Sequence, residues 1–250
     1  MTLVVTEVSE KFGCVLAGDT AVTIGRTRVL LCAEKVQYSS EANIGFSVWG
    51  NACLAGRRVD ELIASFVSQL KPTETPRSAG KQLALLLTCE GTNDGRGWDV
   101  LRGGVHICGY EGFVPVLFHV HTGHTPPAPQ GPFQLYEDFQ DGRKGVQLRN
   151  GYFETFGHLF DAMQQYAARL QSSGYKWPFE TIEDRVSYYS IMINTVAQTL
   201  MAAGRLPAVG PSVSAFAFNQ NGIQVDKRLP RGSADFCSKG SCEGMASFCG

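Results

Sequence analysis

The stretch TLVVTEVSEKFGCVLAGDTAVTIG (residues 2–25) decides the fold. Residues 2–8 alternate between apolar and polar side chains, and residues 13–20 form a mostly apolar run, so both are predicted to be β-strands. The polar segment between them, SEKFG, is typical of a hairpin turn. Thr2 follows Met1 directly, and Asp19 ends the second strand. A threonine with a free amine can supply a nucleophile and its own base.

The remainder of the chain alternates blocks of strands with blocks of helices. Further strands are expected in 28–40, 43–50 and 98–123, and a closing hairpin in 212–225. Helices are expected in 54–70, 78–91, 152–174 and 182–204, the last two ending at Gly174 and Gly204. The polar segment 136–150 is expected to be a loop or a short strand. This order predicts an α+β fold, a four-layer αββα sandwich of two antiparallel sheets with a helix pair on each outer face.

Composition excludes several classes of function. The chain has 250 residues, 44% of them hydrophobic, so it can bury a sizeable core. Its net charge of −1 and the lack of a basic stripe argue against a nucleic-acid partner. No apolar run is long enough for a membrane span and no signal peptide is evident, so a cytoplasmic protein is expected. Five cysteines in apolar surroundings are expected to be reduced core thiols: Cys14, Cys32, Cys53, Cys89 and Cys108.

Beyond the opening hairpin, Lys35 lies in CAEKV, Gly50 lies in SVWGNA, and VGPSVSAFAF (209–218) leads into the last hairpin. With Thr2 and Asp19, these elements resemble the β-type subunits of proteasomes, in the N-terminal nucleophile (Ntn) hydrolase superfamily, and most closely the bacterial Anbu-type homologues. Asp19 and Lys35 are sixteen residues apart, as in that family. The resemblance runs to about residue 228 and is specific over the first fifty. It implies one Ntn-hydrolase domain (1–229) followed by a tail (230–250).

The resemblance implies a threonine endopeptidase that forms an acyl-enzyme. Removal of Met1 would free the amine of Thr2, which titrates at about pH 7.7–8.0 and can accept the hydroxyl proton. Lys35 would lower the pKa of the Thr2 hydroxyl, and Asp19 would hold Lys35 in place. The backbone N–H of Gly50 would stabilise the oxyanion, a contribution of about 2.7–4 kcal/mol.

The same resemblance places the substrate as an added strand between the backbone of Thr23 and residues 50–52. Four residues would line the first side-chain pocket: Val22, Ala33, Val48 and Ala52. Since all are small or apolar, an acidic or basic substrate side chain is expected to find no partner there. The resemblance also implies a ring or helical homo-oligomer, a peptide or unfolded-protein substrate, a possible separate ATPase and no cofactor.

The sequence departs from the family pattern near the amine. Many members carry an Asp and a Ser that orient it, whereas Leu206 and Val209 occupy the corresponding segment here, and Ala21 replaces a frequent arginine. Two alternatives therefore remain beside the peptidase: a non-catalytic structural subunit with the same fold, and an Ntn amidase that acts on a small amide.

Two further clusters of potential ligands have structural interpretations. His119, His121 and His124 in HVHTGH could chelate zinc, but no carboxylate completes a metallohydrolase pattern, so strand-end histidines are favoured and no metal is predicted. Cys237, Cys242 and Cys249 lack CxxC spacing and lie in a Gly/Ser-rich segment, which favours a flexible tail over metal or redox chemistry. This tail could dock on a neighbouring subunit.

Overall fold

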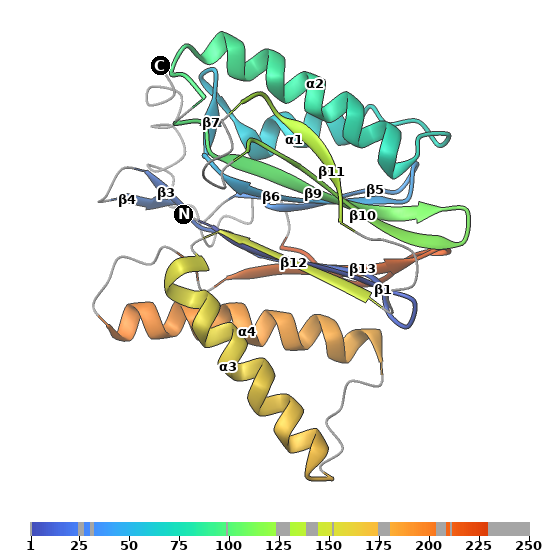
Figure 1. The fold of residues 1–250 in the computed structure, drawn as a ribbon, viewed down its shortest axis with the longest axis vertical. Coiled ribbons are helices and arrows are strands. Elements are labelled where there is room, and N and C mark those ends of the chain that lie inside the picture. The colour runs from blue at the N-terminus through green and yellow to red at the C-terminus, as the bar shows by residue number, and fades with distance from the viewer. Residues whose placement is uncertain are drawn as a thin grey trace.

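The structure is a computed structural model that describes residues 2–24, 28–30, 33–98, 100–123, 131–138, 145–151, 153–174, 181–203, 209–210 and 212–229. Two antiparallel sheets lie face to face, with helices on both outer faces (Figure 1). This confirms the predicted four-layer sandwich. The predicted tail, 230–250, lies outside the described residues.

Each of the two large sheets has five strands. The first sheet has the order β12 (Gly145–Gly151), β1 (Leu3–Ser9), β2 (Gly13–Asp19), β13 (Val213–Asn219) and β14 (Gly222–Lys227). The second has the order β11 (Gln134–Glu137), β10 (Val114–His121), β9 (Gly103–Glu111), β6 (Ile44–Gly50) and β5 (Val36–Ser39). Two short ribbons, β3 (Val22–Ile24) with β4 (Arg28–Leu30) and β7 (Cys53–Leu54) with β8 (Arg57–Arg58), flank them.

The opening hairpin forms the centre of the first sheet. Every residue of β1 and β2 is buried, because the second sheet covers one face and α4 (Ile182–Ala202) covers the other. Burial of an alternating strand on both faces requires partners for its polar side chains. Glu7 accordingly accepts hydrogen bonds from Arg185 Nε, at 2.5 Å, and from the hydroxyl of Tyr189, both on α4.

The segment 136–150, expected to be a loop or a short strand, contains a strand in the structure. Its second half is the strand β12, which pairs with β1 over its whole length, from Leu3 opposite Gly151 to Ser9 opposite Gly145. β12 is an edge strand in which Val146 and Leu148 alternate with polar residues, and none of its residues is fully buried. Its pairing partner, β1, lies at the start of the chain and far from β12 in sequence, so local periodicity could not reveal the pairing.

Each outer side of the sandwich has a pair of helices. α1 (Val59–Val67) and α2 (Pro76–Asp94) cover the second sheet. α4 lies along the first sheet, and α3 (Phe153–Ser172) begins beside it, crosses α4 and extends away from the sheet (Figure 1). α3 is followed by Gly174 in a left-handed conformation, as predicted. α4 ends at Ala202 with Ala203 as its C-cap, and the predicted terminator Gly204 lies outside the described residues.

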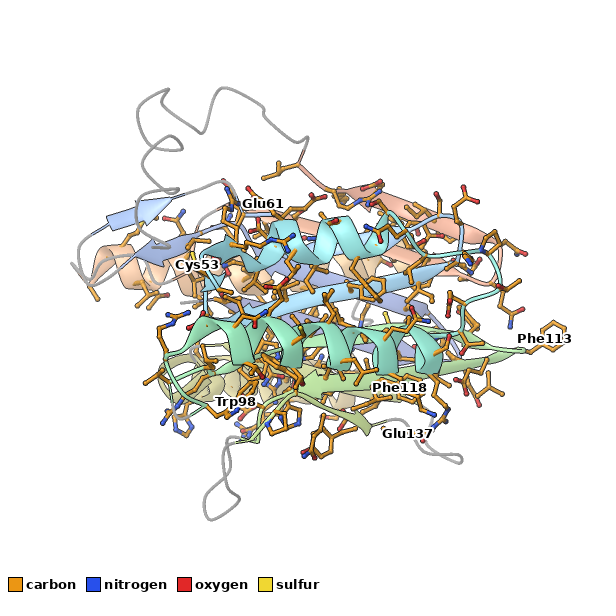
Figure 2. All side chains as sticks on the ribbon, turned by 90° about the horizontal axis from the view of Figure 1, so that it is seen from above. Cys53, Glu61, Trp98, Phe113, Phe118 and Glu137 are labelled. Atoms are coloured by element: carbon orange, nitrogen blue, oxygen red, sulfur yellow. The ribbon has the colours of Figure 1, made fainter. Side chains whose placement is uncertain are left out.

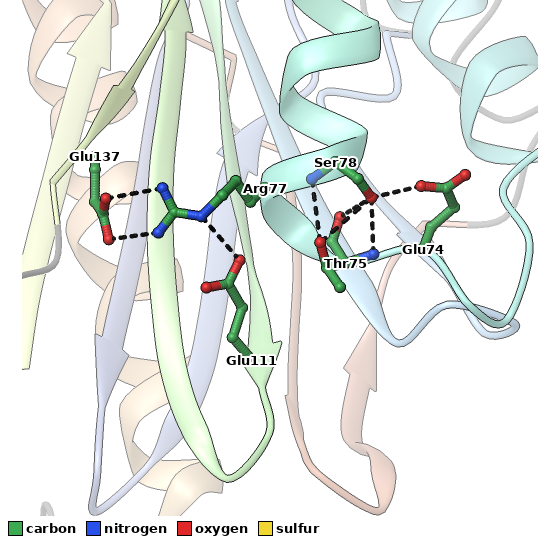
Figure 3. A network of polar contacts seen from close by, with 6 residues as sticks. All are labelled: Glu74, Thr75, Arg77, Ser78, Glu111 and Glu137. Atoms are coloured by element: carbon green, nitrogen blue, oxygen red, sulfur yellow. Dashed lines mark hydrogen bonds and ion pairs between the residues drawn. The ribbon is translucent and has the colours of Figure 1, made fainter.

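A polar network fixes the start of α2 (Figure 3). Thr75 accepts a hydrogen bond from the backbone N–H of Ser78, and the Ser78 hydroxyl accepts one from the backbone of Thr75, which forms a capping box. Arg77 in the first turn pairs with Glu137 of β11 at 3.0 Å and with Glu111 at the end of β9 at 3.4 Å. These contacts tie the helix to two strands of the sheet below it. Beyond this network, Phe113 projects from the β9–β10 hairpin and is 85% exposed (Figure 2).

The cysteines only partly match the expectation of reduced core thiols. Cys14 and Cys108 are free and buried, as predicted. Cys89 is free but exposed on α2, and Cys53 is disulfide-bonded, so the prediction is wrong for these two. Cys32 lies outside the described residues. Apolar residues occupy both faces of α2 near Cys89, since Leu85 is 73% exposed while Leu83 and Leu87 are buried, so the local sequence did not show which face Cys89 lies on.

Among the described helices, none combines the length and apolar character that crossing a membrane demands.

Candidate active site

Asp19 holds together the segments that surround Thr2. It is fully buried at the end of β2 and accepts four hydrogen bonds. Oδ1 accepts from the backbone N–H of Leu3 at 2.7 Å and from Lys35 Nζ at 2.9 Å. Oδ2 accepts from the backbone N–H groups of Ala21 at 3.0 Å and Gly210 at 2.9 Å. The carboxylate thereby fixes Leu3, the residue that follows Thr2, together with the segments at Ala21, Lys35 and Gly210.

Lys35 is the buried cation of this group. Its Nζ also donates to the backbone oxygen of Ala21, so two of its three N–H groups have acceptors in the protein. Burial lowers its pKa, an effect that the nearby charges of Asp19 and Asp60 oppose. Lys35 still borders the same cleft as Thr2. Its remaining N–H is therefore the group that can serve a ligand or the Thr2 hydroxyl.

A cleft of about 410 Å³ joins the predicted site residues. Seven of them line it: Thr2, Val22, Ala33, Lys35, Val48, Gly50 and Ala52. Asp19 lies buried behind Lys35 and does not line it. The backbone of Thr23 lies in β3, next to the lining residue Val22, and its side chain is outside the described part of the structure. Six further residues complete the lining: Trp49, Asn51, Val59, Asp60, Arg102 and Gly151.

Gly50 has a conformation that only glycine adopts without strain. Its φ is +99°, and an added Cβ would lie 2.3 Å from the backbone oxygen of Arg102. The next residue, Asn51, donates its N–H to that same oxygen at 2.9 Å. The backbone at Gly50 is thus held against the start of β9 by a close contact and a hydrogen bond.

Gly151 is a second obligatory glycine of the cleft, and sequence reasoning missed it. Its φ is +131°, and an added Cβ would lie 1.7 Å from the backbone oxygen of Thr2. It ends β12, the strand whose pairing with β1 could not be read from the local sequence. The glycine allows β12 to lie directly against the backbone of Thr2.

The cleft as a whole has charged residues in its lining, beside the four small or apolar residues expected for the first side-chain pocket. Asp60 lines the cleft, and Arg58 binds its two carboxylate oxygens at 3.0 and 2.6 Å. Arg102 also lines it, and this residue is exposed. Both lie outside the first fifty residues, where the family pattern is specific, so no motif pointed to their place in the cleft.

A polar network links the two sheets through His106. Its Nδ1 lies 3.0 Å from Thr6 Oγ1, which is 2.6 Å from Ser47 Oγ, and its Nε2 lies 2.7 Å from Asn150 Oδ1. Burial lowers the pKa of His106 to about 4, so the imidazole is neutral at physiological pH. Asn150 precedes Gly151 on β12. The sequence held no signal for His106 beyond its place in an apolar strand.

The two described histidines of HVHTGH have partners within the protein. Trp49 Nε1 donates to His119 Nε2 at 3.0 Å, and His121 Nδ1 lies 2.9 Å from the backbone oxygen of Thr122. The ring of His121 also stacks on Tyr136, with centroids 4.3 Å apart. Over the described residues, no three potential ligands are grouped as a metal site requires. His124 lies outside them.

The region expected to orient the amine is apolar where it is described. Val209 is fully buried in the cluster between the first sheet and α4. Its neighbour Gly210 contributes only its backbone N–H, to Asp19. Leu206 lies outside the described residues. The side chain of Val209 therefore offers no hydrogen-bonding group where the resemblance led us to look for one.

No protein-family model matches this sequence, and no curated protein matches it. Solved structures do. One described as a helical assembly of the Anbu complex from Pseudomonas aeruginosa has a TM-score of 0.57 at 14% identity, covering 94% of this chain and 89% of that one. Anbu, an ancestral beta-subunit, from Yersinia bercovieri has a TM-score of 0.55 at 15% identity over 100% of this chain and 92% of its own. An Anbu (Gly-1) mutant from Hyphomicrobium sp. strain MC1 scores 0.53 at 16% identity, with 99% and 92% coverage. The chain therefore has the fold of the Anbu proteins, which confirms at the level of the fold the resemblance read from its first fifty residues.

Proposed function

We propose that the chain is an N-terminal threonine hydrolase, an endopeptidase whose nucleophile is Thr2 after removal of Met1. One observation carries the proposal: the buried Asp19–Lys35 pair borders Thr2 in a cleft that also contains Gly50. A buried ion pair with side chains 0% and 6% exposed is costly to keep, and such pairs are common where a reaction uses the charge.

The first chemical step forms a bond between Thr2 Oγ and the substrate carbonyl carbon. The freed α-amine of Thr2 accepts the hydroxyl proton, directly or through water. The remaining N–H of Lys35 points its positive charge at the developing alkoxide, and Asp19 holds the ammonium in place. The backbone N–H of Gly50 donates to the carbonyl oxygen as it becomes an oxyanion.

The second half of the reaction returns Thr2 to its starting state. The C–N bond breaks, the ammonium of Thr2 gives its proton to the leaving amine, and an ester of Thr2 remains. Water then attacks the ester carbonyl, with the amine as base, and releases the acid. The small residues of the cleft leave room for an extended chain beside β3 and residues 50–52.

The proposal includes self-assembly. The Pseudomonas aeruginosa neighbour is described as a helical assembly, which supports a ring or helical homo-oligomer for this chain. A hydrolase with open access to folded proteins would be indiscriminate, whereas enclosure restricts it to peptides or unfolded chains. A separate ATPase that feeds such chains, and a cytoplasmic location, are consistent with this proposal.

The second candidate is a non-catalytic subunit of the same fold. Val209 favours it, because this apolar side chain replaces a group that would orient the amine. In that case Asp19 and Lys35 serve only as a buried link between β2, the segment before β5 and the loop at Gly210.

Intact mass spectrometry before and after incubation with a peptide epoxyketone tests the proposal. We expect loss of the methionine mass and one adduct per chain, mapped to Thr2, with no adduct on Thr2→Ala. Retention of Met1, or a free Thr2 that stays unlabelled while a known threonine protease is labelled in parallel, would establish the structural subunit instead. Cleavage of acyl-amino-acid amides without cleavage of peptides would assign an amidase.

A further inference from the structure

The charged residues of the cleft differ in how they are neutralised. Lys35 is paired with Asp19 at 2.9 Å, and Asp60 is paired with Arg58 at 2.6 Å. Arg102 forms no ion pair or side-chain hydrogen bond with the described part of the chain. Among the described lining residues, the charge left for a ligand is thus positive and belongs to Arg102.

The backbone of Arg102 is rigidly placed beside the oxyanion position. Its oxygen accepts the N–H of Asn51 at 2.9 Å and its own N–H donates to Val100 O at 3.1 Å. The same oxygen is the atom that an added Cβ at Gly50 would meet. The side chain therefore extends from a fixed point next to Gly50, while the residue stays exposed to solvent.

We propose that Arg102 binds a carboxylate of the substrate and selects acidic substrates for this cleft, a proposal that rests on the threonine hydrolase function above. A guanidinium offers a planar pair of N–H groups that matches a carboxylate, and it stays charged at every physiological pH. A bound substrate covers the cleft and excludes water, which strengthens the pair relative to one on an open surface.

Two parts of a peptide can supply the carboxylate. One is an acidic side chain on the acyl portion, which remains on Thr2 in the ester. The other is the C-terminal carboxylate of the leaving portion. The chemistry recognised by Arg102 is the same, but the first selects acidic residues and the second selects cleavage near the end of a chain.

Paired reactive probes test the first source. Two peptide epoxyketones that differ only in Glu or Gln next to the epoxyketone are incubated with the wild type and with Arg102→Gln, Arg102→Lys and Arg169→Gln. We expect the Glu probe to label the wild type about tenfold faster than the Gln probe. Arg102→Gln removes this preference, so that the Glu and Gln probes label at equal rates, and Arg102→Lys keeps part of it. Arg169, exposed in the last turn of α3, makes the matched change of charge away from the cleft and leaves the preference intact.

Binding of unreactive peptides to Thr2→Ala tests both sources without catalysis. Calorimetry measures the binding of peptides with a Glu or a Gln side chain and with a free or an amidated C-terminus. The two proteins compared are Thr2→Ala and the double variant Thr2→Ala/Arg102→Gln. A carboxylate preference that disappears in Arg102→Gln supports the proposal, and the peptide that carries it identifies the source. Equal binding and equal labelling of charged and neutral peptides overturn it. If neither probe labels Thr2 but the binding preference holds, the hydrolase function fails and the carboxylate site stands.

Discussion

Asp19 shows how one carboxylate can organise a site. Its two oxygens accept from Leu3, Ala21, Lys35 and Gly210, which come from four separate segments of the chain. Because every one of these donors is buried with it, replacement of the carboxylate affects both the charge of Lys35 and three backbone N–H groups.

We expect Asp19→Asn to lower the free energy of unfolding by about 3–5 kcal/mol, because it leaves a buried ammonium without its counter-charge. The amide also presents an NH2 group to backbone N–H donors. Urea denaturation of both proteins measures the difference. Asp226→Asn is the matched control: Asp226 pairs with Arg228 at 2.6 Å, but its side chain is 40% exposed, so the loss there is at most about 1 kcal/mol. Equal losses in the two variants would show that the Asp19–Lys35 pair has no special role in stability.

Gly50 allows a second test at the scale of one residue. In Gly50→Ala the new Cβ would lie 2.3 Å from Arg102 O, so the backbone of the cleft must shift. We expect labelling of Thr2 by an epoxyketone to slow on the order of 10²-fold, as misplaced catalytic groups do. Gly95→Ala is the control, since Gly95 has φ +75° and nothing within 4 Å of an added Cβ. The alanine in Gly95→Ala would have a strained backbone conformation but no steric clash. This variant should lose about 1–2 kcal/mol of stability, and epoxyketone labelling of Thr2 should not change. An unchanged labelling rate in Gly50→Ala would remove Gly50 from the mechanism.

At the scale of elements, the two sheets are joined by polar contacts as well as by apolar packing. Val8, Leu16, Phe216 and Phe218 belong to the apolar cluster between the sheets. The His106 network links β1, β6, β9 and β12 nearer the cleft. A buried network of this kind stabilises one register of the sheets only while every member has its partner.

The neutral state of His106 makes stability depend on pH. Its pKa is about 4 in the folded chain against 6.5 unperturbed, so between these values the unfolded chain binds a proton that the folded chain does not. The free energy of unfolding should therefore fall as the pH drops from 6.5 to 4, with a contribution from this residue of about 3 kcal/mol. Urea denaturation across this range measures it, and His106→Gln should reduce the slope. His158→Gln, on the exposed face of α3, should leave the slope unchanged. A slope that is the same in all three proteins would contradict a buried neutral His106.

At the scale of the whole molecule, the proposed assembly has a direct test. Size-exclusion chromatography with light scattering should give the mass of an oligomer, that is, several times the 27.2 kDa mass of one chain. Enclosure of the clefts further predicts that small epoxyketones label Thr2 while a folded protein substrate stays intact. A monomer at micromolar concentration, with an open cleft that cleaves folded proteins, would contradict self-compartmentalisation.

The sequence by itself determined the elements whose signals are local. Alternation in residues 2–8 and the turn at SEKFG predicted the first hairpin, and helical periodicity predicted all four helices. The resemblance to proteasome β-type subunits implied the pairing of Asp19 with Lys35, which the structure shows at 2.9 Å between the end of β2 in one sheet and the residue before β5 of the other.

Only the tertiary structure decided what depends on segments that are far apart in the chain. β12 has only two apolar side chains, Val146 and Leu148, and becomes a strand because β1 offers it a complete edge, which places Gly151 against Thr2. Asp60 and Arg102 enter the cleft because β6 and β9 pair there and α1 begins there. His106 is polar in a buried strand and is accommodated because Thr6 and Asn150 approach it from the other sheet. Periodicity reports which face of an element is buried, whereas partners across the sandwich follow from packing of the whole chain.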